Sequence, residues 1–150
     1  MPVGAEPAPR YRRTQSGAGL RVLIAIGPIV LVIVGFMLGQ SLLLPLAVAL
    51  GLVGFVFTSL TVEVTATHLV WSFGPGVWRN AIPLATIATA TAETNKWWWG
   101  WGIHRTPRGW LYNVAGLKAV EVSTRDGRRV RIGSDEPERL ASVILAAMHG

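Results

Sequence analysis

A long run without charged side chains most constrains how this chain of 150 residues can fold. The run covers residues 22–62, a stretch of 41 residues. One helix of that length would be about 60 Å long, roughly twice the hydrocarbon thickness of a bilayer. Residues 39–41, with the sequence Gly-Gln-Ser, form the polar break near its middle. We therefore predict two membrane-spanning helices, at about residues 22–38 and 42–60, joined by a tight turn.

The remaining sequence divides into a tail and a domain. Residues 1–19 are rich in Pro, Gly, Ala and Arg without an apolar period, which predicts a disordered basic tail before the hairpin at 20–60. Residues 61–150 are enough for one small domain, with ten Lys and Arg against seven Asp and Glu. The chain has no cysteine, which excludes disulfides, thiol catalysis and cysteine-based metal sites.

Cations before the first span predict the topology. Arg10, Arg12, Arg13 and Arg21 favour a cytoplasmic N-terminus, and two crossings would return the domain to the cytoplasm. A cleaved signal peptide is the weaker alternative, because a second apolar segment follows the first at once. The excess of Arg over Lys, with abundant Ala and Gly, indicates a bacterial protein. We expect a multi-pass protein of the bacterial cytoplasmic membrane.

Small residues four apart predict how the spans pack. Gly35 and Gly39 form one such pair, and Ala47 and Gly51 form another. This spacing lets helices approach closely in lipid, either within the hairpin, which we favour, or between two copies. The oligomeric state stays open. Neither span carries an ionisable residue, which argues against an ion or proton pathway.

The period changes from helical to alternating after the second span. We predict strands at residues 62–66, 69–73, 77–82, 86–93 and 110–114, then a hairpin of 118–124 with 128–132. A three-residue loop in this hairpin would oppose Val122 to Val130, Val120 to Ile132 and Glu121 to Arg131. Register follows the apolar face, so we expect this loop, with Gly127 in the left-handed conformation.

A C-terminal amphipathic helix should follow, capped by Ser134 or Asp135 and with Pro137 in its first turn. Its apolar face would consist of Leu140, Val143, Ile144 and Ala147.

Two segments of the domain carry a family resemblance. Residues 101–114 (WGIHRTPRGWLYNV) and 126–137 (DGRRVRIGSDEP) are similar to segments that recur in small bacterial membrane proteins with a pleckstrin-homology-like domain. The resemblance covers residue 20 to the C-terminus. It implies a seven-stranded, partly open antiparallel barrel capped by the C-terminal helix. It implies no catalytic activity, and fold alone does not define function.

A tryptophan-rich segment is the strongest candidate site. Four of the seven tryptophans fall within five residues, next to several cations. Tryptophan favours the membrane–water interface and cations attract anionic headgroups, so the segment could contact lipid or a partner protein. Alternatively, alternate tryptophans belong to a strand and close the end of the barrel. The candidate residues are Lys96, Trp97, Trp98, Trp99, Trp101, Arg105 and Arg108.

A second basic group lies at the last predicted hairpin. It could form an anionic-lipid face, but a solvated outer face is the favoured interpretation. The domain's net charge of +3 is too small for a nucleic-acid-binding surface. The group consists of Arg125, Arg128, Arg129 and Arg131.

No motif for catalysis or for a cofactor stands out. His68, His104 and His149 lack the spacing of metal ligands, and no nucleophile elbow, phosphate-binding glycine loop or carboxylate pair occurs. We therefore expect a non-catalytic interaction or regulatory module without cofactors, which contacts membrane lipids, anionic ones included, at the cytoplasmic surface. The alternative is a structural subunit that docks another membrane protein.

Overall fold

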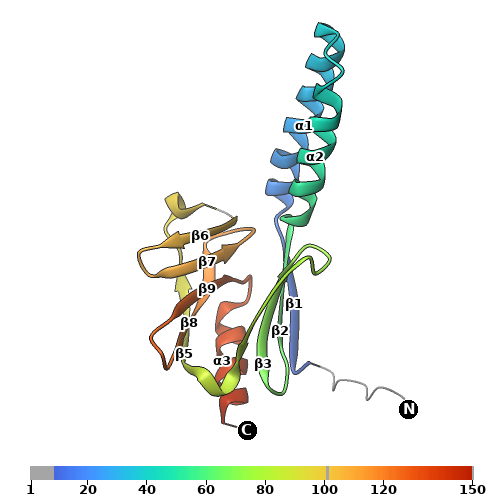
Figure 1. The fold of residues 1–150 in the computed structure, drawn as a ribbon. Coiled ribbons are helices and arrows are strands. Elements are labelled where there is room, and N and C mark those ends of the chain that lie inside the picture. The colour runs from blue at the N-terminus through green and yellow to red at the C-terminus, as the bar shows by residue number, and fades with distance from the viewer. Residues whose placement is uncertain (1–8, 101, 150) are drawn as a thin grey trace, which may run out of the picture.

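A computed structural model of the chain describes residues 9–100 and 102–149 (Figure 1). Nine strands and three α-helices make up these residues, together with two short 3-10 helices, η1 and η2. The elements, in chain order, are β1 (Tyr11–Ser16), α1 (Ala18–Leu38), α2 (Leu43–Val56), β2 (Ser59–Val64), β3 (His68–Phe73), β4 (Trp78–Pro83), η1 (Leu84–Thr86), β5 (Ile87–Thr94), η2 (Trp97–Trp99), β6 (Gly102–Thr106), β7 (Gly109–Asn113), β8 (Lys118–Thr124), β9 (Arg129–Gly133) and α3 (Pro137–Met148).

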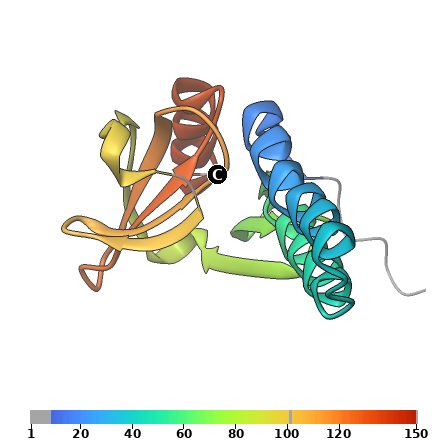
Figure 2. The same cartoon turned by 90° about the horizontal axis from the view of Figure 1, so that it is seen from above.

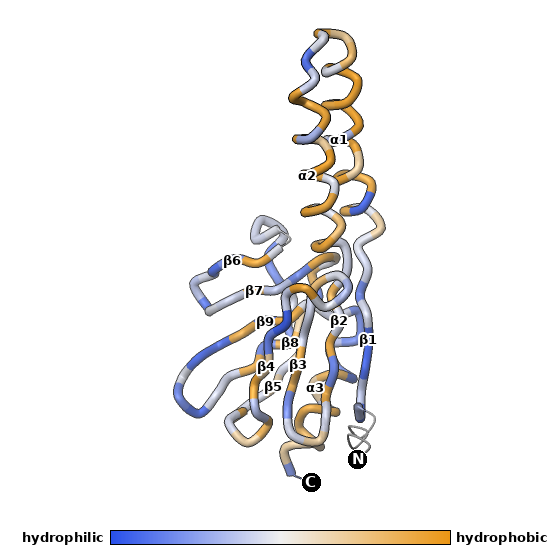
Figure 3. Tube along the Cα trace, turned by 45° about the vertical axis from the view of Figure 1, so that its right-hand side comes forward, coloured by the Kyte–Doolittle hydropathy of each residue, from blue (hydrophilic) through white to orange (hydrophobic). Residues whose placement is uncertain are grey.

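The apolar run forms a helical hairpin that projects from the domain, as Figures 1 and 3 show. Among the described residues, α1 is the one helix that is long and apolar enough to cross a membrane. The second helix is apolar but has only 14 residues, or about 21 Å. The expectation of a second span reaching residue 60 is wrong. The Thr58 hydroxyl donates a hydrogen bond to the Phe55 carbonyl at 2.8 Å where the helix ends, and Leu60 already lies fully buried in β2.

The hairpin packs on itself through small residues. Gly35 and Ala47 are buried, and a Cβ at Gly35 would lie 3.2 Å from the Leu43 Cβ. Gly39 instead ends α1 in the left-handed conformation, with φ +63°. A Cβ added at Gly39 would have no other packing atom of the described residues within 4 Å. The closest approach is at Gly54, a position the sequence analysis missed, where a Cβ would overlap the side chain of Ile24. The small residues therefore serve packing within the hairpin.

The hairpin is an insertion between two paired strands. β1 and β2 are antiparallel, from Tyr11 opposite Val64 to Ser16 opposite Ser59. The prediction of a disordered tail is therefore wrong for Tyr11–Ser16, and the expected domain boundary at residue 61 cuts through β2. Because the register pairs residues about 50 positions apart, local sequence could not reveal it. Residues 1–8 of the predicted tail lie outside the described residues.

The strands form two separate sheets. The first has the order β1-β2-β3-β4, and the second has the order β5-β8-β9-β7-β6. The pairs are antiparallel except β7 with β9, which run parallel. Within the described residues no pairing joins the two sheets, so the expected partly open barrel of seven antiparallel strands is not confirmed. β1 and β6 are the strands that the sequence analysis missed.

The α+β class, mostly β with a C-terminal helix, is confirmed. Helix α3 lies between the two sheets and packs on β5, β8 and β2 (Figures 1 and 2). Leu140, Ile144 and Ala147 are buried as predicted, and Val143 packs against the same core. The expectation that Ser134 or Asp135 caps this helix is wrong, because Glu136 is the N-cap residue and, among the described residues, no side chain caps it. The Ser134 hydroxyl accepts a hydrogen bond from the Glu136 N–H at 3.1 Å, one residue before the helix begins.

The predicted register of the last hairpin is confirmed. Val122 opposes Val130, Val120 opposes Ile132 and Glu121 opposes Arg131. Gly127 has φ +88°, the left-handed conformation that the three-residue loop requires. The apolar face therefore determines the register, as expected.

Hydrogen bonds in the turn of this hairpin lower the pKa of the Asp126 carboxyl group, which a substitution can test. The Thr124 hydroxyl and the Arg128 N–H donate to the Asp126 carboxylate, and these bonds lower the Asp126 pKa from its ordinary value of 3.8, Thr124 foremost. The folded-state pKa is the lower one, so this stabilisation is present above the unfolded pKa and is lost as the pH falls through the folded pKa. Thr124→Val should raise the Asp126 pKa towards its ordinary value. An NMR titration of the carboxyl carbon would contradict this if the pKa were unchanged.

Candidate functional site

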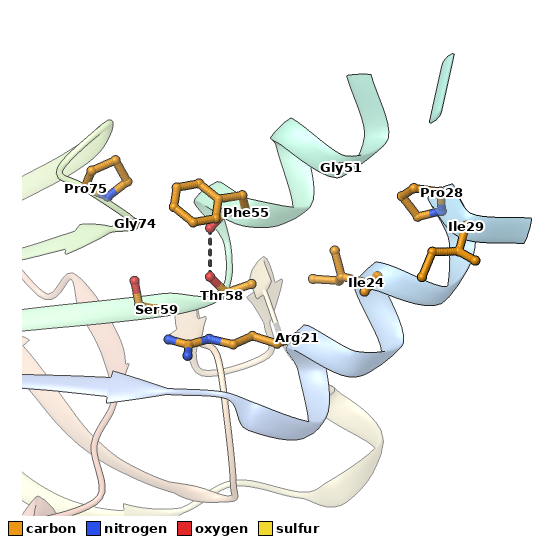
Figure 4. Close-up of a pocket in the computed structure, with 11 residues that line it drawn as sticks. Arg21, Ile24, Pro28, Ile29, Gly51, Phe55, Thr58, Ser59, Gly74 and Pro75 are labelled. Atoms are coloured by element: carbon orange, nitrogen blue, oxygen red, sulfur yellow. Dashed lines mark hydrogen bonds between the residues drawn. The ribbon is translucent and has the colours of Figure 1, made fainter. Parts of the chain in front are cut away.

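A cavity of about 780 Å³ lies where the hairpin meets the first sheet (Figure 4). Arg21 extends from the first turns of α1 towards Ser59, at the start of β2. The β3–β4 turn closes the other side with Gly74 and Pro75. The lining changes from polar at the sheet to apolar along the helices, where it includes Ile24 and other aliphatic or aromatic side chains. The remaining lining residues are Ala25, Pro28, Ile29, Gly51, Phe55 and Thr58.

The tryptophan-rich segment is an exposed turn rather than a strand. Trp97–Trp99 form η2, and Gly100 follows with φ +67°. Trp97 is 75% exposed and Trp98 60% exposed, so neither closes the end of the sheet. Their rings meet edge to face with centroids 5.8 Å apart, and the Lys96 ammonium lies 5.0 Å from the Trp98 centroid. Trp101 lies outside the described residues. The strand interpretation is therefore wrong for the residues of η2.

A buried arginine holds this turn in place. Arg131 is 2% exposed, so the expectation that it belongs to a basic surface is wrong. Its Nε lies 2.6 Å from the Glu121 carboxylate, its Nη1 donates to Asn95 Oδ1 at 3.1 Å, and its guanidinium lies 5.1 Å from the Trp99 ring centroid. The buried Asn95 N–H also donates to the Leu117 carbonyl. The sequence analysis missed Asn95, because nothing in its local pattern marks it as a bridging residue.

Exposed aromatic residues from both sheets, Trp78 of β4 and Trp110 of β7, also line a groove. A groove of about 560 Å³ is lined by Trp78, Ile103 and Trp110 together with Phe57 and Gly102. Trp78 and Trp110 are about half exposed, and the sequence analysis assigned them only to strands. Their wide separation in sequence concealed that they share one groove.

Arg105 and Arg108 flank the turn between β6 and β7 and are exposed. In Figure 1 these two strands lie at the end of the second sheet nearest the hairpin. The two arginines therefore belong to the same end of the domain as η2.

The second basic group lies at the other end of the domain. Arg125, Arg128 and Arg129 are exposed at the β8–β9 turn, and the Arg125 N–H donates to the Thr86 carbonyl beside η1. Figure 1 places this turn away from the hairpin, whereas η2 lies level with the hairpin's base. One flat surface at the base of the hairpin therefore cannot contact both basic groups.

In the part of the chain that the structure describes, titratable side chains do not gather into a metal-binding cluster. There, no three His, Asp or Glu side chains lie close enough to hold a metal ion. His68 instead contacts the Thr67 hydroxyl at 2.8 Å, and His149 contacts the Leu145 carbonyl at 2.8 Å.

Comparison with known proteins does not assign the chain to a family. No protein-family model matches the sequence, and a search of curated proteins finds no significant match.

Proposed function

We propose that this protein is a non-catalytic, membrane-anchored interaction module whose domain contacts lipid headgroups. The hairpin would insert into the bilayer, and the end of the domain that carries η2 would lie on the membrane surface. Anionic lipids are the favoured contacts because Lys96, Arg105 and Arg108 accompany the exposed tryptophans.

The main support for this proposal is the position of η2 relative to the base of the hairpin. In Figure 1 the tryptophan-rich turn lies level with the base of the helices, at the same end of the domain. Trp97 and Trp98 are largely exposed to solvent, an unfavourable position for two large aromatic side chains in water. At a bilayer surface the same rings would occupy the interfacial region that tryptophan prefers. Insertion of the hairpin and burial of these rings would therefore occur together.

The pairing of β1 with β2 supports an anchor that enters and leaves on one side of the membrane. The Gly17 N–H donates to the Thr58 carbonyl at 3.2 Å, which brings the two ends of the hairpin together. Arg12 and Arg13 lie before this junction and Arg21 lies just after it in the first turns of α1, and clustered cations favour the cytoplasmic side. We infer a two-crossing topology in a bacterial cytoplasmic membrane, with both termini cytoplasmic.

Crossing by the shorter helix α2 would require extra residues or a thinner bilayer. The turn at residues 39–42 adds apolar Leu42, and Phe57 follows the helix at its other end. Local thinning of the bilayer costs only a fraction of a kcal/mol per Å of mismatch.

We also propose a relationship to pleckstrin-homology-like domains. Two sheets that pack around one C-terminal helix support it, whereas the parallel pair β7–β9 departs from the antiparallel pattern that the resemblance implies.

Depth-dependent fluorescence quenching tests the lipid contact. The full chain, reconstituted in phosphatidylglycerol vesicles, should lose tryptophan emission to lipids brominated near the headgroup, because Trp97 and Trp98 would lie at that depth. Replacing both residues by phenylalanine should remove a large part of this quenching. The matched control is Trp71→Phe, since Trp71 is buried in the core and should contribute little.

The docking alternative predicts a different result. If η2 binds a partner protein, Trp97 and Trp98 should remain open to water in vesicles that contain this chain alone. The double phenylalanine variant would then quench like the wild type, and the lipid-contact proposal would be wrong.

A further inference from the structure

We propose that the cavity at the base of the hairpin binds one anionic phospholipid, with its phosphate at Arg21 and one acyl chain along the hairpin. This inference rests on the proposed function, because the site forms only if the hairpin lies in a bilayer. It concerns a different surface from η2 and assigns a ligand to an individual pocket.

The polar end of the cavity fits a phosphate. Arg21 is exposed and, within the described residues, forms no ion pair with a carboxylate. The lining contains no acidic side chain, and Ser59 adds a hydroxyl group, whereas the Thr58 hydroxyl already donates to the Phe55 carbonyl. An arginine guanidinium binds phosphate oxygens through paired hydrogen bonds. An anionic group is therefore the complementary ligand.

A second cation lies across the β3–β4 turn. Arg79 is exposed and lines an adjoining polar groove, which shares Gly74 and Pro75 with the cavity. In that groove Arg12 already pairs with Glu63 at 3.1 Å. Among the described residues Arg79 has no such partner, so it adds positive charge on the headgroup side of the site.

The apolar end of the cavity continues as a groove along the helices. A second hollow of about 370 Å³, lined only by apolar residues, shares Pro28 and Ile29 with the first and extends to Ile33 and Val48. From Arg21 to Ile33 the groove follows α1 for about 18 Å, at 1.5 Å per residue. Gly51 lines this space, and a Cβ there would lie 3.9 Å from the Pro28 Cγ in ordinary van der Waals contact, so a larger side chain is needed to fill it.

The change from a polar to an apolar lining favours a phospholipid over other possible ligands. A soluble phosphate compound would use only the polar end, and a partner helix would leave the unpaired Arg21 charge without a complement. A phospholipid places its phosphate and its acyl chain at the matching ends of one continuous hollow. The inferred ligand is therefore an anionic phospholipid bound with its chain parallel to α1.

Native mass spectrometry of the full chain in mild detergent tests the site. Phosphatidylglycerol and phosphatidylcholine with identical acyl chains are titrated separately. We expect about tenfold stronger retention of phosphatidylglycerol, because the choline cation of phosphatidylcholine offsets its phosphate charge and is repelled by Arg21 and Arg79. Arg21→Gln should remove this preference and Arg21→Lys should keep part of it. Arg125→Gln, at an exposed position remote from the hairpin, should behave like the wild type.

A second variant tests the acyl end without a change of charge. Gly51→Leu should fill the groove and weaken retention of both lipids severalfold, while circular dichroism checks that the helices persist. Added glycerol phosphate should not compete at the lipid concentration, because it lacks the chain. Competition by glycerol phosphate, equal retention of the two lipids by the wild type, or an equal loss in Arg125→Gln would overturn the site.

Flotation with liposomes separates the two proposals. A wild-type chain that floats but shows no preference for phosphatidylglycerol contradicts the lipid site alone. A wild-type chain that does not float contradicts the membrane-anchored function itself.

Discussion

Replacing Arg131 by methionine should lower the free energy of unfolding by about 3–5 kcal/mol, the loss expected when one partner of a buried ion pair is removed. Methionine keeps much of the side-chain volume, so the loss reports on charge rather than on a cavity. Glu121, whose side chain is 13% exposed, would lose its 2.6 Å partner, and Asn95 would lose a hydrogen-bond donor. Guanidinium unfolding of the chain in mild detergent, followed by tryptophan fluorescence, measures this difference.

Two further variants identify the cause of this loss in the free energy of unfolding. Arg129→Met removes the same charge from an exposed position on the same strand and should change the free energy of unfolding by less than about 0.5 kcal/mol. Adding Glu121→Gln to Arg131→Met should recover part of the loss, because the more buried of the two carboxylates that Arg131 contacts is then gone; the other, Glu93, is 37% exposed. A loss below about 1 kcal/mol for Arg131→Met would show that the ion pair does not stabilise this sheet.

The same substitution should also release the tryptophan-rich turn. Asn95 and Trp99 both contact the guanidinium, and they lie on either side of Trp97 and Trp98. The position of the exposed Trp97 and Trp98 rings thus depends on a buried charge in a different strand. A more mobile η2 in Arg131→Met should appear as faster amide hydrogen exchange at residues 96–100.

Replacing residues 18–57 by Asn-Gly should convert the protein into a folded, water-soluble domain. The Gly17 N–H already bonds to the Thr58 carbonyl, so these residues can close a two-residue β-turn, for which Asn-Gly is the preferred sequence. Nearly all the exposed aliphatic surface of α1 and α2 is removed with the hairpin. Ultracentrifugation after expression should move the protein from the membrane fraction to the soluble fraction.

A shorter fragment provides the matched control. A chain beginning at Ser59 lacks the hairpin and also β1, which exposes the edge of β2 and removes the buried Tyr11 and Gln15. Unpaired edge strands promote aggregation, so this fragment should precipitate or unfold at a lower temperature. An Asn-Gly variant that remains with membranes would show that the domain surface alone is a sufficient anchor. Equal stability of the two proteins would show that β1 is dispensable.

Local patterns predicted most of the elements in this protein. The uncharged run, the strand alternation and the helical spacing after Pro137 each depend on residues close together in sequence. The β8–β9 register could also be predicted, because a short loop leaves few pairings and one of them places Val120, Val122, Val130 and Ile132 on one face. These signals are local, so they can be recognised in the sequence without the tertiary structure.

The length of the second helix could not be predicted. Residues such as Leu60 and Val62 fit an apolar helix as well as a buried strand, since both environments exclude water. Pairing with β3, where Leu60 opposes Phe73, decides in favour of the strand. The tertiary structure therefore shortens α2 relative to the apolar run.

Hydrophobic periodicity reports directly on local burial, so the residues alone predict an apolar hairpin and a small, mostly β domain with a C-terminal helix. Three features emerge only in the folded chain: Tyr11–Ser16 belong to the domain, Arg131 is buried, and Arg21 and Ser59 border one cavity. Each depends on partners that are tens of residues away in sequence. A polar strand such as β1 has no apolar pattern of its own, and its pairing with β2 and the 3.0 Å contact of Arg13 with Asp135 hold it in place.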